Sequence, residues 1–132
     1  MSNSAIYTVN QTATELAANS QIPLGGIIRH FGRCANLEGS NITLCSNGYY
    51  KVDVSITAEP TTAGPVSAQL YLNGMPYDGA QAETTVATAG DSANLSFTCL
   101  VRIMCGNASS IGLRLGEEGA TVTNVACVVE KI

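Results

Sequence analysis

The sequence is poor in charged and aromatic residues. Only 12% of its 132 residues are Asp, Glu, Lys or Arg, and 5% are aromatic, with no tryptophan. An average soluble domain has about 25% charged residues. A surface with so few charges suits side-by-side packing in an oligomer or a particle better than life as a highly soluble monomer. The net charge of −4 and the lack of a basic cluster argue against a nucleic-acid partner, because nothing would neutralise the phosphates.

Targeting and membrane signals are also lacking. Residues 1–20 contain neither a basic segment nor a long apolar run, so they do not read as a signal peptide. No apolar segment reaches the length of a membrane-spanning helix. We therefore expect no membrane partner and folding in a cytoplasm.

The cysteines show no disulfide or metal pattern. They are odd in number, irregularly spaced and without a Cys-x-x-Cys pair. Cys99 and Cys127 lie in alternating apolar runs, where a reduced thiol behaves as a small hydrophobe. The alternative, that Cys34, Cys45 and Cys105 pair or bind metal, stays open, although one His and no ligand spacing argue against it.

No catalytic motif competes with a structural role. His30 is the only histidine, no Gly-x-Ser-x-Gly elbow is present, and a strand-end His bonded to a backbone group is the commoner case. Glu117 and Glu118 lie between glycines, which predicts a solvated turn. The spacing of Asp78, Glu83 and Asp91 matches no calcium loop. We expect no enzyme activity, metal or cofactor.

The clearest feature present is a strand that opens from Asn47-Gly48. Its side chains alternate in polarity over residues 49–57, which is the period of a half-buried strand. One face carries Tyr50, Val52, Val54 and Ile56, and the other carries Tyr49, Lys51, Asp53, Ser55 and Thr57.

Shorter β-like runs surround this strand. Residues 66–72 alternate before Asn73-Gly74, which predicts a hairpin because both residues tolerate a positive φ. Glu15–Ala18 fits either an edge strand or a helical turn. Further runs are Ala5–Val9, Ile27–Phe31, Ile42–Leu44, Leu95–Ile103, Ile111–Leu115 and Ala120–Ile132.

Two of these runs are apolar on both sides. In the last run, Val122, Ala126 and Val128 are expected on one side, with Val125, Cys127 and Val129 on the other. A strand that is apolar on both faces has protein on both faces, which in a two-sheet sandwich indicates a subunit interface. The residues expected in the trimer interface or the core are Leu100, Met104, Val122, Val125, Ala126, Val128 and Val129.

Eight to ten short strands with turns between them predict an all-β antiparallel two-sheet sandwich. The pattern alone leaves jelly roll and immunoglobulin-like sandwich open. The segments Gly48–Val52, Leu70–Gly74, Leu95–Ile103 and Thr121–Glu130 resemble strands of the tumour-necrosis-factor and complement-head superfamily. This resemblance implies a jelly-roll sandwich, in a homotrimer. The chain lacks the Phe-rich C-terminal strand of the animal members, so their ligand sites are not carried over.

The chain also resembles small phage and prophage structural proteins, through Ser4–Thr12 and Val122–Lys131. This resemblance implies a virion protein made in the bacterial host cytoplasm, as a capsid decoration protein or head-fibre component. Its partners would be itself and capsid or other virion proteins. Location on a capsid, a fibre or a tail stays open.

A receptor- or glycan-binding head module is the alternative function, with host-surface glycan as the possible partner. Asp78–Ala82 and Ser109-Ser110 are expected as exposed loops at the tip, and Tyr49, Tyr71 and Tyr77 as the aromatics available for stacking on sugar.

The expected organisation is an N-terminal arm or first edge strand over residues 1–24, followed by a jelly-roll domain over residues 25–132. The arm is polar and cannot bury a core of its own. We expect it to contact the particle or the neighbouring subunit through its β-like run, Ala5, Ile6, Tyr7, Thr8 and Val9. The alternative is that this run is an ordinary first strand of the sandwich.

Overall fold

The computed structural model describes residues 4–32, 35–45, 47–103 and 109–132, and the regular elements in these ranges are all β-strands. Within them, no helix is long and apolar enough to cross a membrane. The strands are β1 (Ala5–Asn10), β2 (Thr14–Leu16), β3 (Gly26–Phe31), β4 (Ala35–Glu38), β5 (Asn41–Leu44), β6 (Gly48–Pro60), β7 (Gly64–Leu72), β8 (Met75–Val86), β9 (Ala93–Ile103), β10 (Ser109–Leu115) and β11 (Ala120–Lys131).

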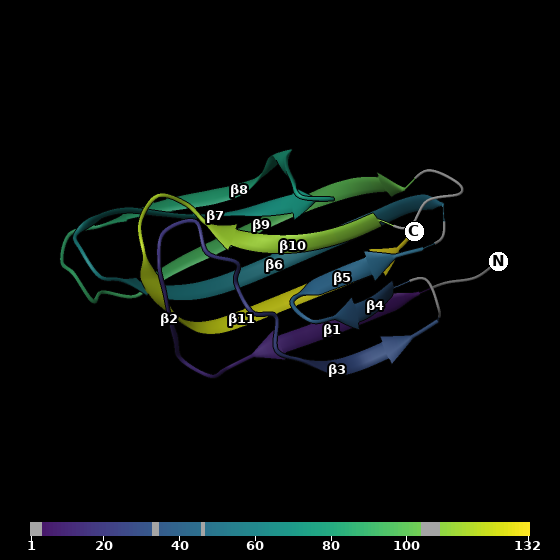
Figure 1. Cartoon of the computed structure of the whole chain (residues 1–132), viewed down its shortest axis with the longest axis horizontal. Coiled ribbons are helices and arrows are strands. Elements are labelled where there is room, and N and C mark those ends of the chain that lie inside the picture. The colour runs from purple at the N-terminus through teal and green to yellow at the C-terminus, as the bar shows by residue number, and fades with distance from the viewer. Residues whose placement is uncertain (1–3, 33–34, 46, 104–108) are drawn as a thin grey trace.

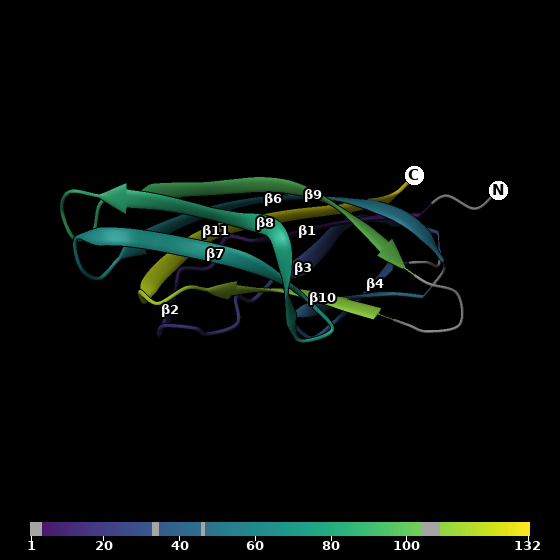
Figure 2. The same ribbon diagram turned by 90° about the horizontal axis from the view of Figure 1, so that it is seen from above.

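These strands form two stacked antiparallel sheets (Figures 1 and 2). The first sheet has the order β3-β1-β11-β6-β9, with β2 also paired to β11, and the second has the order β4-β5-β10-β7-β8. Most neighbouring strands are distant in sequence, as in a jelly roll, whereas β4–β5 and β7–β8 are consecutive. The predicted all-β two-sheet sandwich is confirmed.

The core lies between the sheets and follows the alternation of the sequence. In β6, Tyr50, Val52, Val54 and Ile56 are at most 3% exposed, as the pattern predicted. The same alternation buries Val66, Ala68 and Leu70 in β7, Leu95, Val101 and Ile103 in β9, and Ile111, Leu113 and Leu115 in β10.

The Asn73-Gly74 turn is confirmed. Asn73 has a φ of 52° and Gly74 a φ of 82°, the two positive values that a type I′ hairpin needs. The Asn73 side chain also accepts a hydrogen bond from the backbone N–H of Ser110 at 2.9 Å, and the Asn73 N–H donates to the Ser110 carbonyl at 2.8 Å. The turn between β7 and β8 is thereby fixed to the start of β10.

The last strand departs from the predicted alternation at one point. Its pairing with β6 shifts register between Val122 and Asn124, which marks a β-bulge. The extra residue moves Val122 to the core side, where it is 3% exposed alongside Val125 at 0%. The expectation that Val122 shares a face with Ala126 was wrong, because a strict two-residue period cannot show a bulge.

The N-terminal segment is built into the sandwich. β1 pairs with β11 on one side and with β3 on the other, so it lies inside the sheet, and β3 is the edge strand. Ile6, Ile22 and Leu24 are at most 1% exposed in the common core. This position agrees with the alternative of an ordinary first strand of the sandwich, and β1 is not an edge strand.

The expected run at residues 15–18 contributes Glu15 and Leu16 to a short edge strand, whereas Ala17 and Ala18 lie outside it. β2 pairs with the first part of β11, with Leu16 opposite Ala120 and Thr14 opposite Val122. β1 and β2 thus share one edge of β11.

Thr8 supplies a test of this packing. Its side chain is fully buried in β1, and its Oγ1 has no hydrogen-bond partner. A buried hydroxyl without a partner costs about 1–3 kcal/mol of desolvation. We expect Thr8→Val, which keeps the shape, to raise the free energy of unfolding by about 1 kcal/mol in urea denaturation.

The matched control is Thr98→Val, because the Thr98 hydroxyl donates a 2.6 Å hydrogen bond to Asp53 Oδ1. That variant should show no gain. A lower urea midpoint for Thr8→Val than for Thr98→Val would contradict the burial of an unpartnered hydroxyl in β1.

Candidate subunit interface on the outer face of the first sheet

One side of the β3-β1-β11-β6-β9 sheet faces the core, and among the described residues no second layer of strands covers the other side (Figure 2). We call this second side the outer face. The strand registers align its side chains in rows across the sheet. The central row runs from Tyr7 on β1 through Val128 on β11 and Asp53 on β6 to Thr98 on β9.

The rows on either side of the central one differ in character. One consists of small residues, with Val9, Ala126, Ser55 and Ser96 opposite one another on β1, β11, β6 and β9. The other ends in larger apolar groups, Leu100 on β9 and Phe31 on β3, which are 48% and 57% exposed. The outer face is therefore flat over its small residues, and it carries a large apolar side chain on each of its edge strands, β3 and β9.

The polar groups at the centre of this face partner one another. Thr98 donates to Asp53 Oδ1 at 2.6 Å, and Lys51 Nζ lies 4.0 Å from Asp53 Oδ2. They adjoin a shallow hollow of about 370 Å³ lined by Asp53, Val54, Ser55, Ser96, Phe97, Thr98, Ala126 and Val128.

The residues expected in the interface or the core divide between the two sides. Leu100 is exposed on the outer face, where Ala126 and Val128 are half-buried. Val122, Val125 and Val129 are in the core, at 3%, 0% and 0% exposure. Met104 lies outside the described residues.

The residues expected to attach the chain to a particle divide in the same way. Ile6 and Thr8 are buried in the core. Ala5, Tyr7 and Val9 are half-buried and alternate with them, on the outer face. Attachment of the chain to a particle stays a prediction, and only the outward side chains of Ala5, Tyr7 and Val9 could contact the particle.

The two strand cysteines are shielded thiols. Cys127 is 2% exposed and Cys99 is half-buried beside the core. Burial, with a smaller contribution from the Asp53 charge, raises the pKa of Cys99 from 9.0 to about 11. Burial also raises the pKa of Cys127, to about 12. Cys45 is exposed, whereas Cys34 and Cys105 lie outside the described residues.

The described ranges contain no group of three or more His, Cys, Asp or Glu side chains that could hold a metal ion. His30 Nε2 donates to the Ala35 carbonyl at 2.6 Å, the backbone partner that was expected. Glu117 and Glu118 form a bend between β10 and β11, as predicted, and Glu118 accepts a 3.0 Å hydrogen bond from Thr62.

The two expected tip loops are strands instead. Asp78–Ala82 lies within β8, which pairs with β7, and Ser109-Ser110 begins β10. Gly79, with a φ of 79°, lies within an irregularity of the β7–β8 register, where pairing passes from Gln81 to Pro76 and residues 77–80 have no β7 partner in the register. Gly and Ala have weak strand propensity, so the sequence indicated a loop, and only Gln81 and Ala82 of this segment pair with β7.

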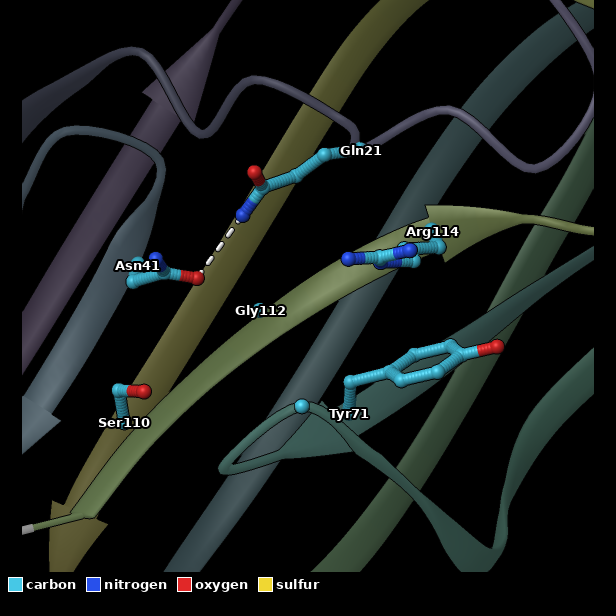
Figure 3. Close-up of a pocket in the computed structure, with 7 residues that line it drawn as sticks. Gln21, Asn41, Tyr71, Ser110, Gly112 and Arg114 are labelled. Atoms are coloured by element: carbon cyan, nitrogen blue, oxygen red, sulfur yellow. Dashed lines mark hydrogen bonds between the residues drawn. The ribbon is translucent and has the colours of Figure 1, made fainter.

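A second hollow, which the sequence did not reveal, lies on the β4-β5-β10-β7-β8 sheet (Figure 3). Gln21, Asn41, Tyr71 and Arg114 come to it from four distant segments. Their spacing in the sequence could not have predicted that these residues meet. Gly112, in the middle of an apolar strand, was a signal that another group lies close to its backbone.

Comparison with known proteins identifies the fold. No protein-family model and no curated protein matches the chain. Murine APRIL shares the fold with a TM-score of 0.76 and 10% identity, over 98% of this chain and 99% of that one. The globular domain of zebrafish complement 1qA protein has a TM-score of 0.65 and 7% identity, over 98% and 95%. PRD1 vertex protein P5 has a TM-score of 0.59 and 13% identity, over 98% and 96%.

At these identities the likeness is one of fold alone. It confirms the jelly roll of the tumour-necrosis-factor and complement-head type that the sequence segments resembled.

The thiols give a pH-dependent test. Unfolded thiols lose their protons near pH 9, whereas the folded state keeps Cys99 protonated to about pH 11 and Cys127 to about pH 12. Above pH 9 the unfolded state therefore binds fewer protons, and the free energy of unfolding falls as pH rises toward 11. We expect the fall to be shallower in a Cys99→Ala/Cys127→Ala variant.

In native labelling at pH 8, Cys45 should react rapidly and Cys99 and Cys127 should react only after denaturant is added, as peptide mapping would show. Rapid native labelling of Cys127, or equal pH slopes for the two proteins, would contradict the shielded position of these thiols.

Proposed function

We propose that the protein is a homotrimeric, non-enzymatic head module of a virion, serving as a capsid decoration protein or a head-fibre component. The observation that carries this proposal is the uncovered outer face, with Leu100 and Phe31 about half exposed at its margins. The two side chains lie on opposite edge strands of the same face, and large exposed apolar groups that share a face of a low-charge protein favour an interaction surface there. The resemblance to trimeric jelly rolls makes a second and third copy of the chain the expected cover.

The chemistry of the outer face suits burial against another sheet. Its small row, with Ser55, Ser96 and Ala126, lets a neighbouring backbone approach closely. Its central polar groups would keep partners when water is excluded, because Thr98 donates a hydrogen bond to Asp53 and Lys51 Nζ lies 4.0 Å from the same carboxylate. Burial of Leu100, Phe31 and Val128 would then contribute about 25 cal/mol for each Å² of apolar surface.

Within this proposal the outward side chains of β1 contact the neighbouring subunit. Tyr7 is opposite Val128 and Val9 is opposite Ala126, so a subunit seated on the centre of the outer face would touch both, and Ala5, opposite Glu130, is in the next row. The strand is fixed on both edges, which favours this role over that of a detachable arm reaching to the particle.

The virion part of the proposal has separate support. The resemblance to phage structural proteins includes β1 and β11, and PRD1 vertex protein P5, which its name assigns to a vertex, has the same fold. Capsid or other virion proteins are the proposed partners, and the bacterial host cytoplasm is the proposed place of synthesis. A trimer closed through the outer faces would leave the second sheet of each subunit outside.

The trimer is tested by light scattering coupled to size exclusion. The wild-type protein should have three times the 13.6 kDa chain mass at micromolar concentration. Leu100→Glu and Val128→Glu should fall to monomers, because a trimer would bury an unpaired carboxylate at a cost of several kcal/mol. A wild-type monomer would contradict the trimer.

Met75→Glu is the matched control, since Met75 is 69% exposed at the start of β8 in the other sheet. It should leave the trimer intact. If Met75→Glu dissociates while Leu100→Glu stays trimeric, the interface lies on the β4-β5-β10-β7-β8 sheet and the proposed outer-face interface is contradicted.

The virion role is tested by imaging purified particles assembled in cells that express epitope-tagged protein. Tagged wild type should decorate the particles, and Leu100→Glu should be lost from them. Particles free of the tagged wild type would overturn the virion role while leaving the trimer untouched.

A further inference from the structure

We propose that the hollow on the β4-β5-β10-β7-β8 sheet binds the carboxylate of an acidic sugar, with the Arg114 guanidinium as its main contact. The hollow is on the sheet opposite the outer face, so the proposal does not depend on the oligomeric state or on the virion role.

The hollow is held open by a fixed set of contacts (Figure 3). Gln21 Nε2 donates to Asn41 Oδ1 at 2.8 Å and to the Ser40 carbonyl at 3.3 Å, which places these two amides side by side. Gly112 lies beneath them, and a Cβ there would be 2.5 Å from Asn41 Oδ1. The glycine thus provides the space that any other residue would fill.

Arg114 gives the hollow a positive charge without a protein partner. Its guanidinium carbon lies 5.0 Å from the centroid of the Tyr71 ring, and Figure 3 shows it extending over the strand toward Gln21 and Asn41. No carboxylate lines the hollow, and Arg114 forms no ion pair in the part of the chain that the structure describes. Stacking on Tyr71 orients the guanidinium and leaves its N–H donors available.

The charge of this hollow contrasts with the rest of the molecule. The chain has a net charge of −4, the hollow on the outer face contains Asp53, and another is lined by Glu83, Glu117 and Glu118. An anionic group entering from solvent would therefore find its complement at Arg114. A carboxylate fits best, because its two oxygens match the planar fork of a guanidinium.

The remaining lining matches hydroxyl groups. Gln21 and Asn41 offer amide donors and acceptors, and Figure 3 shows the Ser110 hydroxyl turned toward the hollow. The Ser110 N–H is already bonded to Asn73 Oδ1, so this residue is fixed in position. The volume of about 140 Å³ is below the 300–1,000 Å³ typical of drug-sized ligands. One sugar ring with a carboxylate combines the required charge, hydroxyls and size.

The test is ligand-observed NMR on the full chain with N-acetylneuraminic acid and glucuronic acid as probes. Both acids should give saturation transfer, and their methyl esters, which lack the negative charge, should bind at least about tenfold more weakly, as expected for loss of a bidentate ionic contact. Inorganic phosphate and sulfate are included as competitors.

Arg114→Gln should weaken binding of the acids at least about tenfold and leave the circular dichroism spectrum unchanged, because Arg114 is exposed. The matched control is Arg102→Gln. Arg102 also stacks on a tyrosine, with its guanidinium carbon 5.8 Å from the Tyr49 ring centroid, but it belongs to the other sheet. This control should bind as the wild type does.

Equal binding of acids and methyl esters would overturn the proposal, as would unchanged binding by Arg114→Gln or equal loss in Arg102→Gln. If phosphate or sulfate binds the hollow more tightly than the sugar acids do, and so displaces them at a lower concentration, the assignment to a sugar carboxylate would be overturned.

Discussion

The fold depends on the pairing of the last strand with strands from the beginning and the middle of the chain. β11 pairs with β6 along nearly its whole length, and its other edge is shared by β1 and β2. Val125, Cys127 and Val129 from this strand are buried in the centre of the core. Because the last strand fills the middle of the sheet, the first sheet is complete only when the whole chain has been placed. Such long-range pairing is typical of slowly folding β proteins.

The same strand shapes the proposed interface. The bulge after Val122 brings that residue to the core side and leaves Ala126 and Val128 on the outer face. Their rows continue through Asp53 and Ser55 of β6 to β9, so one strand supplies both the centre of the core and the centre of the uncovered surface. The hollow around Arg114 belongs to the other sheet, which allows self-association and ligand binding to occupy separate sides of the subunit.

The sequence predicted what depends on neighbouring residues. Alternation identified the core side of β6, and Asn73-Gly74 identified the hairpin, because side-chain direction and turn conformation are local properties. Whether β1 is an arm or an ordinary strand of the sandwich was left open and the bulge in β11 was missed, since both depend on which distant strands pair. The meeting of Gln21 with Arg114 was missed for the same reason. Asp78–Ala82 was mistaken for a loop because its strand propensity is weak, and the pairing of Gln81 and Ala82 with β7 depends on a distant segment.

We propose that other copies of the chain cover the outer face, and hydroxyl-radical footprinting at micromolar concentration would detect that cover. Leu100, Phe31 and Met75 are all large apolar side chains, at 48%, 57% and 69% exposure in the isolated chain. If the outer faces meet, Leu100 and Phe31 will be protected from oxidation while Met75, in the other sheet, will react. Reactivity of Leu100 and Phe31 at the rates expected for freely exposed side chains would contradict the account.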